Sequence, residues 1–295
     1  MPPDNDRIQK PVRRLRKFLK KAPSRPDSQQ IHKLRTDIRR VETTIQAFAL
    51  GDKKNERRVL RSLARLRKRA GKIRDMDVLT GYALRIRLDG ELDCLVQLLE
   101  GLGAERNRHA RKLKTIVKSD GRSLRKRLAR TSSKIDKLLQ QQDTSASPQT
   151  TEAAAKSLGL ASALGRPSRL HKRNLHDYRL RVKELRYLLQ LSDRSDQQKL
   201  VAILGSLKDA IGEWHDWEEL LAFATAIGTH GPACRLLAKQ KATCEKKYDR
   251  ALSFATRVKN TYFAPDTRTK TRKHGRRKRG SLARPVLAAA STIIA

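Results

Sequence analysis

Three side chains that can bind anions recur on one face of a predicted helix near the N-terminus. They are His32, Arg35 and Arg39, within the segment 31–48. At about 100° per residue they lie on one narrow side of the helix, roughly 120° from the centre of its apolar face. Guanidinium and imidazolium groups donate charge-assisted hydrogen bonds to phosphate and carboxylate oxygens. This helix is therefore predicted to carry an anion-binding edge beside the face that enters the core.

The same pattern returns 144 positions later, in the segment 175–191. His176, Arg179 and Lys183 take the places of the first three cations. An apolar face accompanies each copy, with the three-and-four spacing of an amphipathic helix. Its members are Ile31, Leu34, Ile38, Val41, Ile45 and Phe48 in the first copy and Leu175, Tyr178, Val182 and Leu185 in the second. A doubled motif of this kind indicates an internal duplication.

The helix that follows each copy also repeats, now at an offset of 141 residues. Arg67 and Arg74 lie within the apolar stripe of the first such helix, and Lys208 and His215 occupy the matching positions of the second. One interpretation is that their stems pack while their polar heads reach solvent. The other is that the stripe faces a water-filled cationic groove between the two halves. Because cation-capable groups recur in both halves, the pattern favours the groove.

The duplication and the composition together predict an all-α protein of two four-helix bundles related by pseudo-twofold symmetry. Aromatic residues make up only 4% of the 295 residues, which favours helical cores of Leu, Ile, Val and Ala over a β-rich fold. The predicted limits are about 7–142 for the first half, 143–152 for a polar linker, about 153–263 for the second half and 266–295 for a disordered basic tail. Within the first half, separate helical stretches are expected over 91–102, 105–117 and 122–142.

The charge balance points to an anionic partner. Lys and Arg number 68 against 30 Asp and Glu, a formal net charge of +38. Such self-repulsion is expected to be relieved by nucleic acid, an anionic membrane surface or a phosphate-rich polymer. The N-terminus lacks the apolar segment of a signal peptide, and no run approaches the ~18 apolar residues of a membrane-spanning helix. We therefore expect a cytoplasmic protein with no membrane span.

Signatures of catalysis are absent from the sequence. There is no phosphate-binding loop of the G-x-x-x-x-G-K-[ST] type, no G-x-G-x-x-G, no H-E-x-x-H and no carboxylate cluster suited to Mg²⁺. The three cysteines lack the spacing of metal ligands and are expected to be core residues. The sequence therefore predicts a binding protein rather than an enzyme, with no cofactor and no metal site.

The doubled motif resembles the CHAD domain, the conserved-histidine α-helical domain. The motif in each half is an H-x-x-R-x-x-x-[RK] helix followed by a helix with G-x-x-[RH]-D. The residues that carry the resemblance are His32, Arg35, Arg39, Arg74 and Asp75 in the first half and His176, Arg179, Lys183, Arg186, Tyr187 and Asp216 in the second. The resemblance covers residues 7–265. It implies two four-helix bundles whose basic cleft binds inorganic polyphosphate without catalysis, in the cytoplasm and at polyphosphate granules.

The chain departs from this pattern at two positions. Glu42 stands where the second half has Arg186, and Glu184 stands where the first half has Arg40. We expect weaker individual contacts to the ligand at these positions, or a pair within the helix such as Glu42 with Arg39. The candidate polyphosphate-binding residues are His32, Arg35, Arg39, Arg40, Arg67, Arg74, His176, Arg179, Lys183, Arg186, Lys208 and His215. The alternative is a nucleic-acid-associated protein that uses the same surfaces and binds non-specifically through the C-terminal tail.

Overall fold

The structure, a computed structural model, describes residues 5–48, 50–51, 53–88, 92–141, 149–191, 195–227 and 234–263. Over these residues it contains eight α-helices and no strand, which confirms the all-α fold class. The chain divides into two compact units. Unit 1 comprises 1–145 and 226–232, and unit 2 comprises 146–225 and 233–295. The predicted basic tail at 266–295 lies outside the described residues, as does most of the predicted linker.

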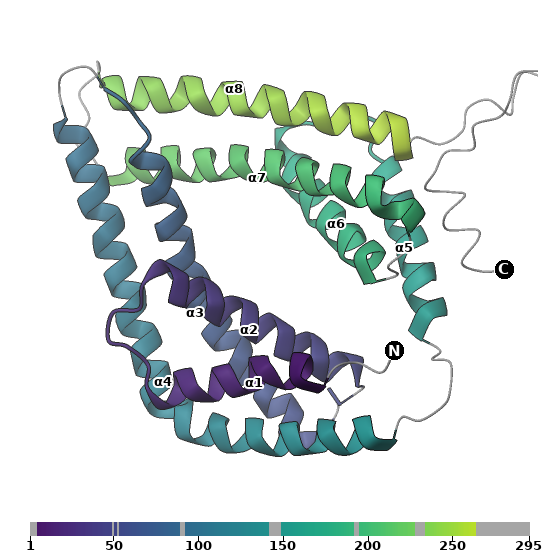
Figure 1. Ribbon diagram of the computed structural model, residues 1–295. Coiled ribbons are helices and arrows are strands. Elements are labelled where there is room, and N and C mark those ends of the chain that lie inside the picture. The colour runs from purple at the N-terminus through teal and green to yellow at the C-terminus, as the bar shows by residue number, and fades with distance from the viewer. Residues whose placement is uncertain are drawn as a thin grey trace, which may run out of the picture. The chain divides into compact units, whose positions relative to one another are not determined.

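Unit 1 is a bundle of the first four helices (Figure 1). They are α1 (Asn5–Lys20), α2 (Ser28–Ala47), α3 (Lys54–Ala83) and α4 (Asp93–Gln141). Helix α1 packs against α2 and α4, and α3 packs against the same two helices. Helix α2 begins with a capping box. The backbone N–H of Gln30 donates to the Asp27 carboxylate, and the backbone N–H of Asp27 donates to the side-chain oxygen of Gln30.

The apolar face predicted for the first motif helix forms part of the unit 1 core. Ile31, Ile38, Val41 and Ile45 are fully buried, and Leu34 is 3% exposed. They join buried leucines, isoleucines and valines from all four helices in one continuous cluster. Burial of each such side chain contributes about 1.5–3 kcal/mol to folding. The core therefore fixes which edge of α2 is left for the cations.

Helix α4 corrects the prediction of three separate helical stretches. It runs without a break for 49 residues. Gly101, Gly103 and Gly121 lie near the predicted ends of these stretches, and glycine lowers helix propensity. Gly121 is instead buried in the contact with α1, where an added Cβ would lie 3.4 Å from the carbonyl oxygen of Leu19. The glycine thus allows two helices to approach closely, and tertiary packing overrides its low propensity.

Unit 2 holds the remaining helices. They are α5 (Gln149–Gly165), α6 (Lys172–Leu191), α7 (Gln198–Ile227, whose last two residues are assigned to unit 1) and α8 (Arg235–Val258), with a 3₁₀ turn at Ser195–Gln197 and a π-helical turn at Lys259–Phe263. The second motif's apolar residues are buried on α6, and Trp214 of α7 is 1% exposed, with its ring centroid 5.5 Å from that of Tyr248 on α8. Among the described residues, no helix is long and apolar enough to cross a membrane.

Candidate polyanion-binding site

In unit 1 the structure brings four of the predicted arginines together on α2 and α3. Arg35 is half-buried, and its Nη1 donates to the carbonyl oxygen of Gly71 at 3.3 Å. Burial lowers the pKa of Arg35, Asp75 opposes this, and the positive charges of Arg39, Arg74 and Arg67 lower it further. The guanidinium nevertheless stays charged at any physiological pH. The cluster is a set of adjacent like charges, and the Asp75 carboxylate lies 3.7 Å from Arg35.

The carboxylate of Glu42 contacts a different arginine from the one predicted. Its Oε2 lies 3.0 Å from Nε of Arg67 on α3, instead of pairing with Arg39 on its own helix. Arg39 is exposed on α2. The pairing across helices therefore fixes the direction of Arg67 and leaves Arg39 directed at solvent.

His32 and Arg40 border a neighbouring cleft of about 540 Å³, which also includes Arg74. Nη1 of Arg74 donates to Oγ of Ser28 at 2.8 Å, so this arginine belongs both to the cleft and to the Arg35 cluster. Sequence reasoning missed two further cations on the same cleft, Arg14 and Lys33, which lie outside the repeated motif. The remaining lining residues are Gln29, Thr36 and Asp37.

In unit 2 the predicted residues meet between α6 and α7. The ring centroids of His176 and His215 lie 4.4 Å apart. Nε of Arg179 donates to the carbonyl oxygen of Lys208 at 3.2 Å. Nζ of Lys208 lies 2.7 Å from Oδ1 of Asp209. As in unit 1, an arginine of the motif helix is anchored on the backbone of the following helix.

Glycines on α7 make room for the arginines of α6. An added Cβ at Gly212 would lie 2.7 Å from Nη2 of Arg179, and one at Gly205 would lie 3.2 Å from Nε of Arg186. The two arginines are seven residues apart, as are the two glycines, which corresponds to about 10 Å along each helix. Sequence reasoning aligned Gly71 with Gly212 but assigned neither a role. A glycine inside a predicted helix usually has a packing or functional reason, so these two positions were recognisable in the sequence as close contacts with a neighbouring element.

Arg186 and Lys183 complete the predicted set. Arg186 lines a cleft of about 500 Å³ between α6 and α7, and its buried Nε has no hydrogen-bond partner among the described residues. Lys183 is exposed on α6. A buried guanidinium N–H without an acceptor is unusual, and a ligand oxygen would satisfy it after a shift of the side chain.

The sequence model of the CHAD domain matches residues 8–225 of the chain. The chain belongs to the CHAD domain family. Comparisons with curated proteins and with solved structures gave no match. CHAD domains are a family associated with polyphosphate binding.

The chemistry of this CHAD domain site is that of anion binding. Its donors are arginine, lysine and histidine side chains, which form charge-assisted hydrogen bonds to phosphate and carboxylate oxygens. Among the described residues, no group of three or more His, Cys, Asp and Glu side chains could hold a metal ion.

His176, beside His215 in this CHAD domain, is a group for which a pH response is expected. Burial lowers the pKa of His176, and the neighbouring His215 and Arg179 lower it further, while Asp177 and Glu219 oppose them. The free protein therefore favours the neutral imidazole. A bound polyanion would favour the imidazolium and raise this pKa.

Stability and polyanion binding are expected to respond to acid in opposite directions. A histidine with a lowered folded-state pKa contributes its full stability above the unfolded value of 6.5, and that contribution is lost as the pH falls below it. Urea unfolding of the free protein should therefore shift to lower midpoints below about pH 6.5. Polyanion affinity should rise several-fold between pH 7.5 and 5.5. The His176→Gln variant supplies the control, because buried His109 also has a lowered pKa and titrates in both proteins. Equal pH responses in the two proteins would contradict the assignment.

Proposed function

We propose that this CHAD domain binds inorganic polyphosphate through the cations of its two motif helices and does not cleave it. One observation carries the proposal: in each unit an arginine of the motif helix, Arg35 or Arg179, is held on a backbone carbonyl of the next helix beside further cations. Positions so fixed suit a ligand that presents only a chain of phosphate oxygens. Pre-organised donors of this kind lose little entropy on binding.

The proposal also concerns the location of the protein in the cell and the symmetry that relates its two halves. Association with polyphosphate granules in the cytoplasm is the setting that the family resemblance implies. The pseudo-twofold relation of the two halves, and a groove formed between them, stay predictions from the sequence repeat. Nucleic acid is the second candidate partner, and its support is the +38 net charge.

A competition experiment separates the two partners. Labelled long-chain polyphosphate should bind tightly, with affinity that falls steeply as salt rises, because binding releases counterions. Orthophosphate should compete poorly, since it can contact only a few donors at once. Excess duplex DNA should displace little of the polymer, and incubation should release no orthophosphate. Tight duplex binding that excess polyphosphate fails to displace would instead support the nucleic-acid role.

A further inference from the structure

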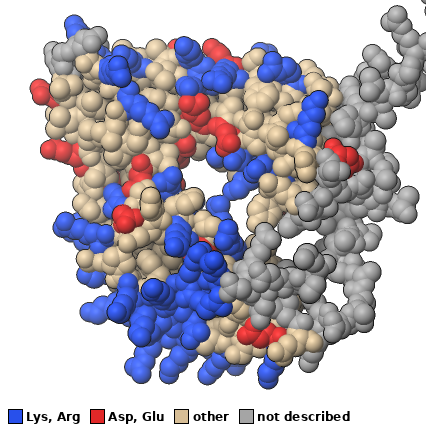
Figure 2. Space-filling model, in the orientation of Figure 1, with Lys and Arg blue, Asp and Glu red and all other residues tan. Residues whose placement is uncertain are grey.

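A second concentration of positive charge lies on unit 1, and it includes none of the candidate residues. Figure 2 shows lysine and arginine side chains gathered over α1 and the neighbouring part of α4. Beneath them is a cleft of about 580 Å³, here called the α1/α4 cleft. Its lining residues are Arg13, Arg16, Lys17, Lys20, Arg122, Arg125, Lys126 and Ala129. None of the twelve candidate residues is among them.

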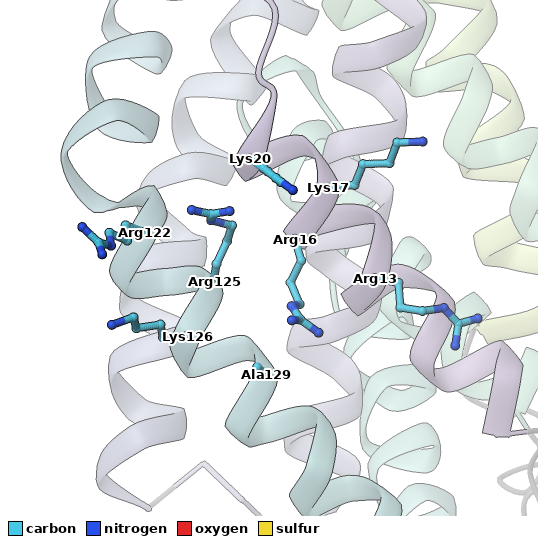
Figure 3. A pocket seen from close by; sticks show the side chains of 8 residues that line it. All are labelled: Arg13, Arg16, Lys17, Lys20, Arg122, Arg125, Lys126 and Ala129. Atoms are coloured by element: carbon cyan, nitrogen blue, oxygen red, sulfur yellow. The ribbon is translucent and has the colours of Figure 1, made fainter.

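The packing of α1 on α4 brings the two rows of cations together. Gln9, which is 5% exposed, donates through Nε2 to the carbonyl oxygen of Ser132 at 3.2 Å and to Oδ1 of Asp136 at 2.8 Å. Ten residues further along α1, Leu19 meets Gly121. The helices are therefore antiparallel, and these two contacts set their register on either side of the cleft. In Figure 3, Arg16 from α1 and Arg125 from α4 point into the space between the helices.

The described residues that line the α1/α4 cleft are all basic except Ala129, and none of them is Asp or Glu. The nearest acids along α4 are committed elsewhere: Asp120 to Arg65 at 2.9 Å, and Asp136 to Gln9. Nε of Arg125 is buried and has no acceptor within the described part of the chain. Like charges facing each other across two helices oppose the packing that holds them, and an anion in the cleft would relieve this repulsion.

A purely structural account explains only part of the arrangement. Lys17 and Lys20 lie in the last turn of α1, where cations are favoured by the helix dipole. Arg122, Arg125 and Lys126 lie inside α4, far from either end, so the dipole does not account for them. A solvated basic face would need neither a hollow nor a guanidinium nitrogen that is buried without an acceptor.

The lining residues also indicate the kind of anion. The cleft offers no aromatic ring, so it has no platform on which bases could stack. The cleft lies between two helices that both contribute cations to it, which suits a flexible phosphate chain that can follow those cations. Cations at Arg13, Arg16 and Lys20 follow the helix for about 10 Å, long enough to contact several phosphate units.

We infer that the α1/α4 cleft is a second binding site for inorganic polyphosphate, separate from the motif-helix cations. The choice of polymer rests on the proposed function, whereas the site stands on the geometry of α1 and α4. One domain would then hold two segments of a chain, or two chains. Two linked sites raise the affinity for long polymers above that for short ones, because the second contact is intramolecular.

Charge-removing variants test the cleft in the full chain, with tripolyphosphate as a short probe and long-chain polyphosphate as the polymer. Arg16→Gln with Arg125→Gln should weaken binding of both about tenfold, and Ala129→Glu, which adds a carboxylate and keeps every cation, should do the same. The matched control is Arg111→Gln with Lys118→Gln, which removes equal charge from exposed positions of α4 outside the cleft. The control should change binding less than twofold. Thermal unfolding should show all variants folded, with the Arg16/Arg125 variant at least as stable as the parent.

The outcomes separate this inference from the proposed function. If cleft variants bind like the control while Arg35→Ala with Arg179→Ala weakens binding, the cleft is no site and the proposed function stands. If only the cleft variants weaken binding, the cleft stands and the motif-helix assignment fails. If the cleft variants lose duplex DNA affinity and keep polyphosphate affinity, the cleft takes nucleic acid and the inference is overturned.

Discussion

Replacement of both Arg35 and Arg179 by alanine is expected to weaken long-chain polyphosphate binding about a hundredfold. Each guanidinium is fixed by a backbone carbonyl of the neighbouring helix, Gly71 for the first and Lys208 for the second. A hydrogen bond to a charged group contributes about 1.5–3 kcal/mol, and two such losses correspond to a factor of 10² to 10⁴. The lower end applies here, because a polymer can shift along the remaining cations. Fluorescence anisotropy with end-labelled polymer at fixed salt measures the change.

The double variant needs a control for charge alone. Arg111→Ala with Arg173→Ala removes the same two charges, one from each unit, at exposed positions outside both motifs. We expect this control to lose no more than about threefold, the share that belongs to long-range attraction. Equal losses in the two double variants would mean that net charge, rather than a site, drives binding.

The sequence predicted the parts of the molecule in which periodicity and repetition agree. Apolar spacing identified the buried face of α2, and the duplication predicted which cations would accompany it. The structure places Arg39, Arg67 and Arg74 close enough to Arg35 for their charges to lower its pKa, and their role in binding stays a prediction. Periodicity succeeds here because one helix face must enter the core, which fixes the direction of every other face.

The parts that were missed depend on contacts between helices far apart in sequence. Nothing local in α4 distinguishes a glycine that ends a helix from Gly121, which accommodates a neighbouring backbone. Glu42 has two possible arginine partners, and only the packing of α2 on α3 selects Arg67 over Arg39. The cations of the α1/α4 cleft are not part of the repeated motif, so the repeat does not predict them.

The candidate site contains interactions that destabilise the free protein: repulsion between like charges and a buried donor without an acceptor. Arg35 is half-buried beside three further arginines, and the guanidinium Nε of Arg186 is buried without an acceptor among the described residues. Buried donors without acceptors cost about 1–3 kcal/mol each. These groups therefore hold the free protein below the stability that its apolar core could provide. A phosphate polymer would supply the missing acceptors, so binding should raise the midpoint of thermal unfolding.

Substitution of alanine for Gly71 and for Gly212 is expected to affect different properties: stability at the first position and polyphosphate affinity at the second. At Gly212 the new Cβ would lie 2.7 Å from Nη2 of Arg179, so the guanidinium must move off its carbonyl. At Gly71 the new Cβ would lie 3.8 Å from Nη1 of Arg35, an ordinary contact that leaves the arginine in place. Alanine improves helix propensity by about 0.5–1 kcal/mol at either position.

Gly71→Ala should therefore stabilise the protein by up to about 1 kcal/mol and leave polyphosphate affinity unchanged. Gly212→Ala should keep its stability within about 1 kcal/mol of the parent, because the displaced hydrogen bond offsets the gain in propensity. Its affinity should nevertheless fall about tenfold, the effect of one misplaced charged donor. Urea unfolding and polymer binding on the same samples measure both quantities. Loss of affinity without loss of stability would show that the glycine acts by positioning Arg179, whereas unchanged affinity would mean that the position of Arg179 is unimportant for the ligand.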